Sequence, residues 1–131
     1  MKYLFSAFVF IFMSFSANAA ALSKDNFKCG NVKVKYINSN YDGGGAYYDE
    51  RQNVIAMNKH YFRKLSSSMQ RFIFLHECGH ARGVDKEYDA DKYAYREARR
   101  LNLMLNVTEI CKEMEDKRRC SNFKTYVNAA N

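Results

Sequence analysis

Two histidines and five carboxylates directly follow an apolar run in residues 72–94, FIFLHECGHARGVDKEYDADKYA. Burying an unpaired charge costs several kcal/mol, so this segment cannot enter the interior of a fold without a compensating partner. The polar groups must therefore either face solvent or converge around something that offsets their burial. The spacing of the neighbouring apolar residues bears on this choice, because it indicates which polar groups lie on the inward faces of helices.

The first part of the segment is predicted to lie on a helix. The serines of SSSMQ (residues 66–70) are N-cap candidates, and Gln70 stands three residues after Ser67, as in a capping box. Gly83 supplies a natural C-terminal stop. Between these signals, four residues recur at helical spacing: Phe72, Leu75, His76 and Gly79.

A second helix is predicted over residues 86–105. One stripe of it, with members separated by threes and fours, consists of Glu87, Ala90, Asp91, Ala94, Ala98, Leu101 and Leu105. If this stripe faces the core, Glu87 and Asp91 point inward, and the small alanine side chains let the two helices approach closely. The alternative is an ordinary amphipathic helix whose acidic first turn is favoured by the helix dipole.

The rest of the sequence places strands before helices. Residues 32–37 (VKVKYI) alternate apolar and basic side chains as in a half-buried strand, and short strands are also expected at 46–48 and 53–58. Further helices are predicted from residue 108 onward and over residues 121–130. There is no proline, internal repeat or low-complexity linker. The pattern predicts one α+β domain, with a small N-terminal β-sheet packed on the helix that carries the histidines and on the helices after it.

The first twenty residues are typical of a secretory signal peptide rather than of this domain. Lys2 is followed by an uncharged, aromatic-rich run and then by small residues at Ala17 and Ala19. We expect cleavage after Ala19, which leaves residues 20–131 as a single exported domain, periplasmic or secreted, with no stable membrane insertion. The alternative is an N-terminal membrane anchor, which the short apolar run disfavours.

The four cysteines all lie beyond the expected cleavage site. Exported chains meet oxidising conditions, so an even number predicts two disulfides. Cys111 and Cys120 would close a short loop, and by elimination Cys29 would pair with Cys78. A buried free thiol at Cys78 is the alternative.

The chain is basic, with a formal net charge of +7. Loss of Lys2 with the signal peptide lowers this to about +6, a surplus that favours anionic surroundings such as the cell-envelope surface. No basic and aromatic motif typical of nucleic-acid recognition stands out, so nucleic acid is not expected as a partner.

HECGH has the form H-E-x-x-H, with His76, Glu77 and His80. Helical residues four apart are rotated by about 40°, so both imidazoles can bind one metal ion, and Glu77 lies to one side where it can contact a bound water. Zinc suits this donor set. The alternative is that both histidines are ordinary core or surface residues.

A catalytic zinc needs a third protein ligand, and the second helix offers one. We assign Glu87 to this position and Asp91 as the hydrogen-bond acceptor that orients a ligand imidazole. Asp85 is a fallback ligand if Glu87 points outward.

HECGH followed by EYDAD resembles the gluzincin metallopeptidases, in particular the branch whose second motif reads E-x-x-A-D, here Glu87, Ala90 and Asp91. The resemblance implies a zincin-like peptidase with one zinc ion, ligands His76, His80 and Glu87, and Glu77 as general base. It covers about a third of the mature chain. The gap between the motifs is far shorter than in most gluzincins. The stretch also resembles the metzincin string H-E-x-x-H-x-x-G-x-x-H, but Lys86 stands in place of its third histidine.

The expected activity is hydrolysis of peptide bonds in peptide or protein substrates by a zinc-bound water, with Glu77 moving the proton. The strand at residues 54–58 is expected to hold an extended substrate by edge pairing. His60 and Tyr95 are candidates for stabilising the transition state, although each is more easily explained as a surface or packing residue.

Two other functions compete with a zinc peptidase. One is a zinc-bearing, non-catalytic binding protein of the cell envelope, because about 112 residues leave little room for substrate-specificity subdomains. The other is a small basic disulfide protein that binds an anionic polymer through REARR (residues 96–100) and DKRRC (residues 116–120).

Overall fold

The computed structural model describes residues 27–38 and 44–131, so the signal peptide expected at residues 1–19 lies outside the described part. Within that part the fold is α+β, with the strands before the helices as predicted. No helix among the described residues has the length and apolar character needed to span a lipid bilayer.

Three strands form the sheet: β1 (Lys33–Ile37), β2 (Ala46–Asp49) and β3 (Val54–Asn58), in the order β1-β3-β2. β1 runs parallel to β3, and β2 runs antiparallel to it. The expectation that residues 54–58 form an edge strand is wrong, because β3 lies in the centre and four of its five residues are buried. Burial on both faces also explains why its sequence does not alternate clearly. The antiparallel edge is β2.

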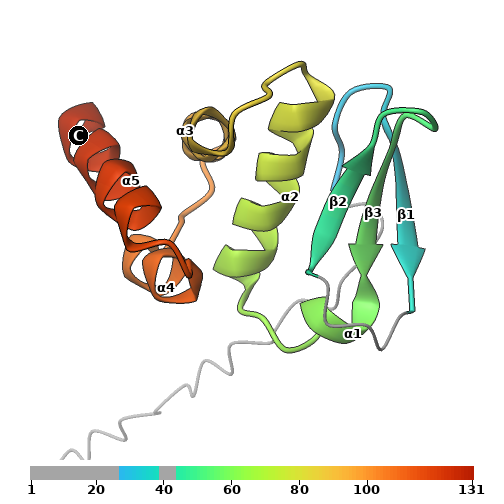
Figure 1. Cartoon of the computed structure of the whole chain (residues 1–131), viewed down its shortest axis with the longest axis horizontal. Coiled ribbons are helices and arrows are strands. Elements are labelled where there is room, and N and C mark those ends of the chain that lie inside the picture. Colours follow the sequence, from blue (N-terminus) through green and yellow to red (C-terminus); the bar gives the residue numbers. More distant parts are fainter. Residues whose placement is uncertain (1–26, 39–43) are drawn as a thin grey trace, which may run out of the picture.

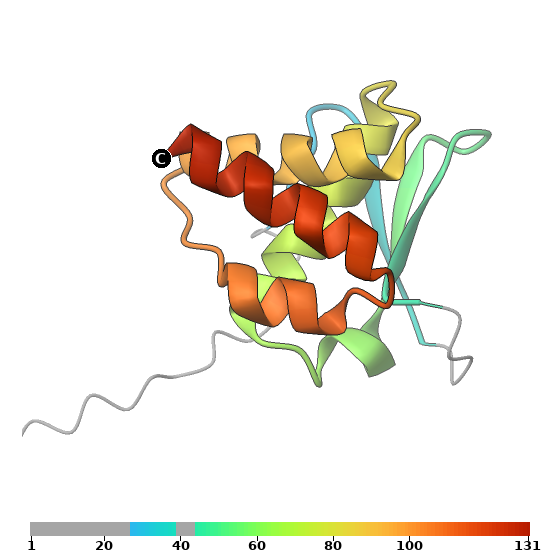
Figure 2. The same cartoon turned by 60° about the vertical axis from the view of Figure 1, so that its left-hand side comes forward.

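The helices follow the sheet in sequence: α1 (Lys59–Phe62), α2 (Ser67–Ala81), α3 (Glu87–Arg100), α4 (Val107–Glu113) and α5 (Lys117–Ala130). In Figure 1, α2 lies between the sheet on one side and α3 and α5 on the other. Figure 2 shows α3 and α5 lying across α2, with α4 nearer its N-terminal end. Because α2 is covered on both sides, it is the element around which the core is built.

Helix boundaries differ from the predicted ones where side chains make local caps. Ser66 rather than Ser67 caps α2, its hydroxyl accepting from the Met69 N–H at 3.2 Å. Gln70 makes no capping box and donates instead to the Phe62 carbonyl at 2.7 Å. α5 begins before residue 121 because the Asp116 carboxylate caps it, accepting from two backbone N–H groups.

α3 ends at Arg100, not at residue 105 as predicted. Asn102 has a φ of +56°, a left-handed conformation that terminates the helix, and the Leu103 N–H returns to the Ala98 carbonyl at 2.8 Å. Leu101 is consequently 45 % exposed and is not part of the buried stripe. The stripe itself is confirmed from Ala90 to Ala98, with Ala90, Asp91, Ala94 and Ala98 buried, whereas the side chain of its first member, Glu87, is 61 % exposed.

Both predicted disulfides are present. Cys29 is bonded to Cys78 and Cys111 to Cys120, so the alternative of a free thiol at Cys78 is wrong. The first bond ties the segment before β1 to the C-terminal half of α2, and the second joins α4 to the first turn of α5. Two disulfides are consistent with an oxidising environment.

Candidate metal centre

The two motif histidines lie in the C-terminal half of α2 and meet the first residue of α3. The Nε2 atoms of His76 and His80 are 3.1 Å apart. Each is also 3.2 Å from a carboxylate oxygen of Glu87. The bend around Gly83, with φ at +87°, turns the chain back so that α3 starts beside the end of α2. Three residues from two helices thus present ligand atoms that all lie within 4.8 Å of one another.

The other ring nitrogen of each histidine is already engaged. His76 Nδ1 is 2.8 Å from Asp91 Oδ1, and His80 Nδ1 is 2.6 Å from the Val84 carbonyl oxygen. An ionised carboxylate and a backbone carbonyl only accept hydrogen bonds, so each Nδ1 must donate. A neutral imidazole that donates through Nδ1 has a lone pair on Nε2. Both lone pairs therefore point toward the Glu87 carboxylate.

This donor set fits a metal ion. Two lone pairs and a carboxylate within 3.2 Å repel one another, and either a metal ion between them or a proton on one Nε2 relieves this repulsion. The observed separations are close to the edge of about 3.3 Å in a tetrahedron with metal–ligand bonds of about 2.0–2.1 Å. The His76–His80–Glu87 group can therefore hold a metal ion. Since 61 % of the Glu87 side chain is exposed, the centre is open to solvent on the α3 side.

Asp91 is fully buried and lies directly behind His76. Burial acts to raise its pKa, but hydrogen bonds from Arg119 and His76 outweigh this and hold the pKa below its ordinary value. Arg119 Nε and Nη2 each lie 2.6 Å from an Asp91 oxygen, a bidentate pair that also raises the pKa of Arg119. Asp91 therefore remains ionised and makes the expected contact with the His76 ring, whereas its role behind a metal-bound imidazole stays a prediction.

Arg119 is the residue of this site that the sequence did not reveal. Besides holding Asp91, its Nη1 lies 3.4 Å from Glu87 Oε2. It belongs to DKRRC (residues 116–120), which the sequence suggested only as a surface contact patch. Three consecutive basic residues at 117–119 carry no periodic signal that selects one of them. The adjacent Cys120 was the available clue, because its disulfide draws this turn of α5 toward α4.

Glu77 lies beside the metal group on the side of α2 that faces the sheet. Its carboxylate accepts a hydrogen bond from the Tyr48 backbone N–H of β2. Burial raises the pKa of Glu77, and the neighbouring His76 and His80 rings, together with the Tyr48 N–H, oppose this rise in part. The carboxyl group is thus partly desolvated, next to both imidazoles, and adjacent to the sheet edge.

The remaining candidate residues lie elsewhere. Asp85 is exposed in the connection between α2 and α3 and is not part of the His76–His80–Glu87 group. Tyr95 is buried and donates its hydroxyl to Asn131 Oδ1 at 3.1 Å, so it is a packing residue. His60 is exposed on α1, at the opposite end of α2 from the histidine pair (Figure 1). Neither Tyr95 nor His60 is placed to stabilise a transition state.

The chain matches no protein-family model, and no curated protein or solved structure is significantly similar to it. Its function must therefore be argued from the chemistry of this site.

Proposed function

We propose that the protein is an exported zinc-dependent peptidase with a gluzincin-like site. The observation that carries this proposal is the convergence of two Nε2 lone pairs and the Glu87 carboxylate, with both Nδ1 atoms already used as donors. Two imidazoles and one carboxylate are a ligand set typical of catalytic zinc, which keeps a further position open. The 61 % exposure of the Glu87 side chain leaves room for a substrate there.

Zinc at this position would supply Lewis-acid polarisation of a substrate carbonyl and would lower the pKa of a water molecule. Glu77 takes the proton from the attacking water on its carboxylate and delivers it to the amide nitrogen of the leaving group. Its partial burial and its Tyr48 hydrogen bond hold the carboxyl group in place for both transfers. Asp91 and Arg119 keep the His76 ring oriented throughout.

The substrate-binding strand in this proposal is β2 rather than β3. β2 has β3 on one side only, and the Tyr48 N–H places its other side next to Glu77. An extended peptide that pairs with this edge would present a backbone carbonyl to the site. Export is proposed from the two disulfides together with the signal-peptide pattern at residues 1–19.

Metal analysis and one substitution test the proposal. The purified mature protein is expected to contain one zinc per chain and to cleave an unstructured protein in a chelator-sensitive manner. Glu77→Gln should retain the zinc, and its turnover should fall by at least about 100-fold, because general-base catalysis typically contributes a rate enhancement of that size. His80→Ala should lose the metal. Normal turnover in Glu77→Gln, or unchanged zinc content in His80→Ala, would reject the assignment.

The second candidate is a zinc-bearing binding protein without catalytic activity. It is favoured by the positions of Tyr95 and His60, which leave both proposed transition-state stabilisers away from the site. This candidate predicts the same zinc content and the same loss of zinc in His80→Ala. It differs in predicting no cleavage by the zinc-loaded protein, so the cleavage assay separates the two.

A further inference from the structure

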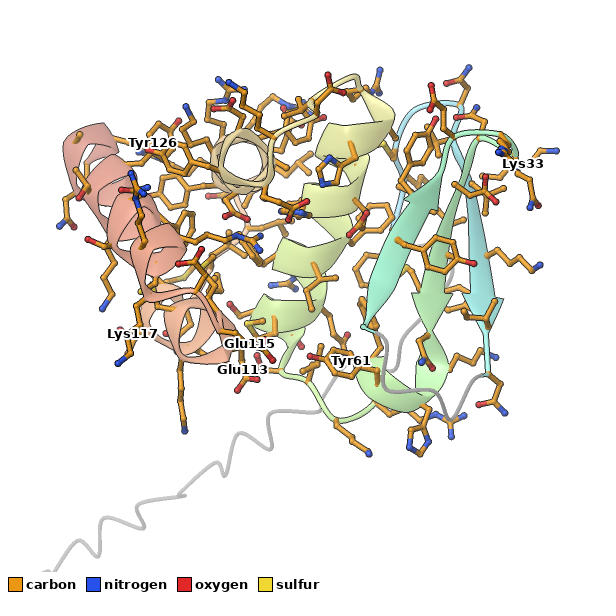
Figure 3. The ribbon with its side chains drawn as sticks, in the orientation of Figure 1. Lys33, Tyr61, Glu113, Glu115, Lys117 and Tyr126 are labelled. Carbon is orange, nitrogen blue, oxygen red and sulfur yellow. A yellow bond between two sulfur atoms is a disulfide. The ribbon has the colours of Figure 1, made fainter. Side chains whose placement is uncertain are left out.

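A groove of ≈ 430 Å³ opens beside α2, between α1 and the connection from α4 to α5. Its volume falls within the range of about 300–1,000 Å³ that is usual for small-ligand sites. The apolar part of its lining consists of Tyr61, Met69, Phe72, Ile73, Ile110 and Met114. In Figure 3, Glu113 and Glu115 lie on one side of the start of α2 and Tyr61 on the other.

The groove lies near the metal group, because α2 and Arg119 contribute to both. Phe72 lies one helical turn before His76, about 6 Å along the axis, and the two ring centroids are 6.2 Å apart. Arg119 lines the groove and also bonds Asp91. A peptide with a carbonyl at the metal group would therefore have an adjacent side chain within reach of the groove.

The charge of the groove is opposite to that of the chain. The net charge of the protein is +7, yet three of the groove-lining residues are the acids Glu113, Glu115 and Asp116. Arg119 is the cation of the lining, and its charge is paired with Asp91 at 2.6 Å. Lys117 points away from the groove in Figure 3. An apolar floor beneath an acidic rim is complementary to a side chain with an aliphatic stem and a cationic end.

We propose that this groove is a specificity pocket for a lysine or arginine side chain of an extended peptide. The inference rests on the proposed peptidase function for its substrate, but the pocket chemistry is independent of bond cleavage. Met69, Phe72 and Ile73 contact the stem of the side chain, and Glu113 and Glu115 pair with its charge. The protein thereby selects peptides with a basic residue next to the bond at the metal group.

Peptide binding tests the pocket without relying on turnover. The ligands are three short unstructured peptides that differ only in a central lysine, norleucine or glutamate, measured by fluorescence anisotropy on zinc-loaded Glu77→Gln protein. We expect the lysine peptide to bind about tenfold tighter than the norleucine peptide, and the glutamate peptide to bind weakest. Glu113→Gln and Glu115→Gln, each made in this background, should each reduce the lysine preference about threefold. Added salt should reduce it further.

Glu50→Gln is the matched control, since it removes the same charge from an exposed turn beyond β2 and should leave the preference unchanged. Equal binding of the lysine and norleucine peptides, or an equal loss in Glu50→Gln, would overturn the pocket. Cleavage by the otherwise wild-type protein is measured separately. Lysine-selective binding without cleavage would support the pocket and reject the peptidase. Cleavage without a preference for basic residues would support the peptidase and reject the pocket.

Discussion

The two imidazoles of the candidate metal group are held by different kinds of acceptor. His80 Nδ1 donates to the Val84 backbone carbonyl, which no side-chain substitution removes. His76 Nδ1 donates to the Asp91 carboxylate, which is itself held by Arg119. A carboxylate behind a ligand imidazole raises the basicity of the ring as well as fixing its orientation. The orientation of the His76 ring therefore depends on two other side chains, Asp91 and Arg119.

Asp91→Asn is expected to weaken metal binding by about 10–100-fold, because the amide retains the shape of the carboxylate but not its charge. The measurement is competition for zinc with a chelator of known affinity, alongside circular dichroism to verify folding. Asp89→Asn is the control. Asp89 lies on the same helix and pairs with Lys92 at 2.7 Å on the surface, so its loss should leave zinc affinity unchanged. Equal affinities in the two variants would contradict the role assigned to Asp91.

At the residue scale, the sequence predicted the members of the site that lie at helical spacing. His76 and His80 are four apart, as are Glu87 and Asp91, so a helix brings each pair onto one face. The prediction failed for Arg119, which reaches the site from another helix, 28 residues after Asp91. Contacts of that kind are set by how α5 packs on α3, and local periodicity carries no information about such packing.

The α2–α3 contact is the element-scale feature that assembles the centre. Gly79 lies on the α2 surface that faces α3, and a Cβ atom at this position would be 3.2–3.4 Å from side-chain atoms of Tyr93. Ala90 and Ala94 are fully buried in α3. Small residues on both helices thus set the interaxial distance, and this distance decides whether Glu87 reaches the two imidazoles.

Gly79→Val is expected to push α3 away from α2, with a loss of about 1–3 kcal/mol in stability and weaker zinc binding. The measurements are the free energy of unfolding by urea and zinc affinity by competition. Gly79→Val combined with Tyr93→Ala is the matched test, because removing the ring provides space for the valine. If the double variant bound zinc no better than Gly79→Val, the tight contact would not be what positions Glu87.

The sequence predicted which segments form strands and helices better than it predicted which of them pack side by side. Alternation at residues 32–37 correctly indicated the half-buried strand β1, and the stripe from Glu87 to Ala98 correctly indicated α3. The order of the strands was not accessible, since pairing β1 with β3 and leaving β2 at the edge depends on contacts distant in sequence. Residues 54–58 were therefore correctly predicted as a strand but wrongly placed at an edge of the sheet.

At the scale of the whole molecule, the disulfides link the site to the stability of a small core. Cys78 follows Glu77 directly on α2, and Cys120 follows Arg119 directly on α5. In the chain-entropy model, a loop of 49 residues corresponds to about 4 kcal/mol and one of 9 residues to about 2.5–3 kcal/mol. For a domain of this size, 1 kcal/mol corresponds to about 4 °C in Tm.

Replacing Cys111 and Cys120 by alanine should therefore lower the Tm of the zinc-free protein by about 10 °C. It should also reduce the further rise in Tm that zinc produces, because the bond holds the turn of α5 from which Arg119 reaches Asp91. Zinc at 100 times its Kd stabilises the folded state by about 2.7 kcal/mol, and a tenfold weaker site loses about 1.4 kcal/mol of this at the same concentration.

Arg119→Ala in the disulfide-bonded protein separates the two effects. It should reduce the zinc-dependent rise in Tm to a similar extent without the chain-entropy loss, whereas Arg118→Ala, an exposed neighbour, should not. Combining Arg119→Ala with the cysteine replacements should reduce the zinc-dependent rise no further than either change alone, because both act through the same contact with Asp91. Additive losses in the combined variant would show that the disulfide and Arg119 influence the metal centre by separate routes.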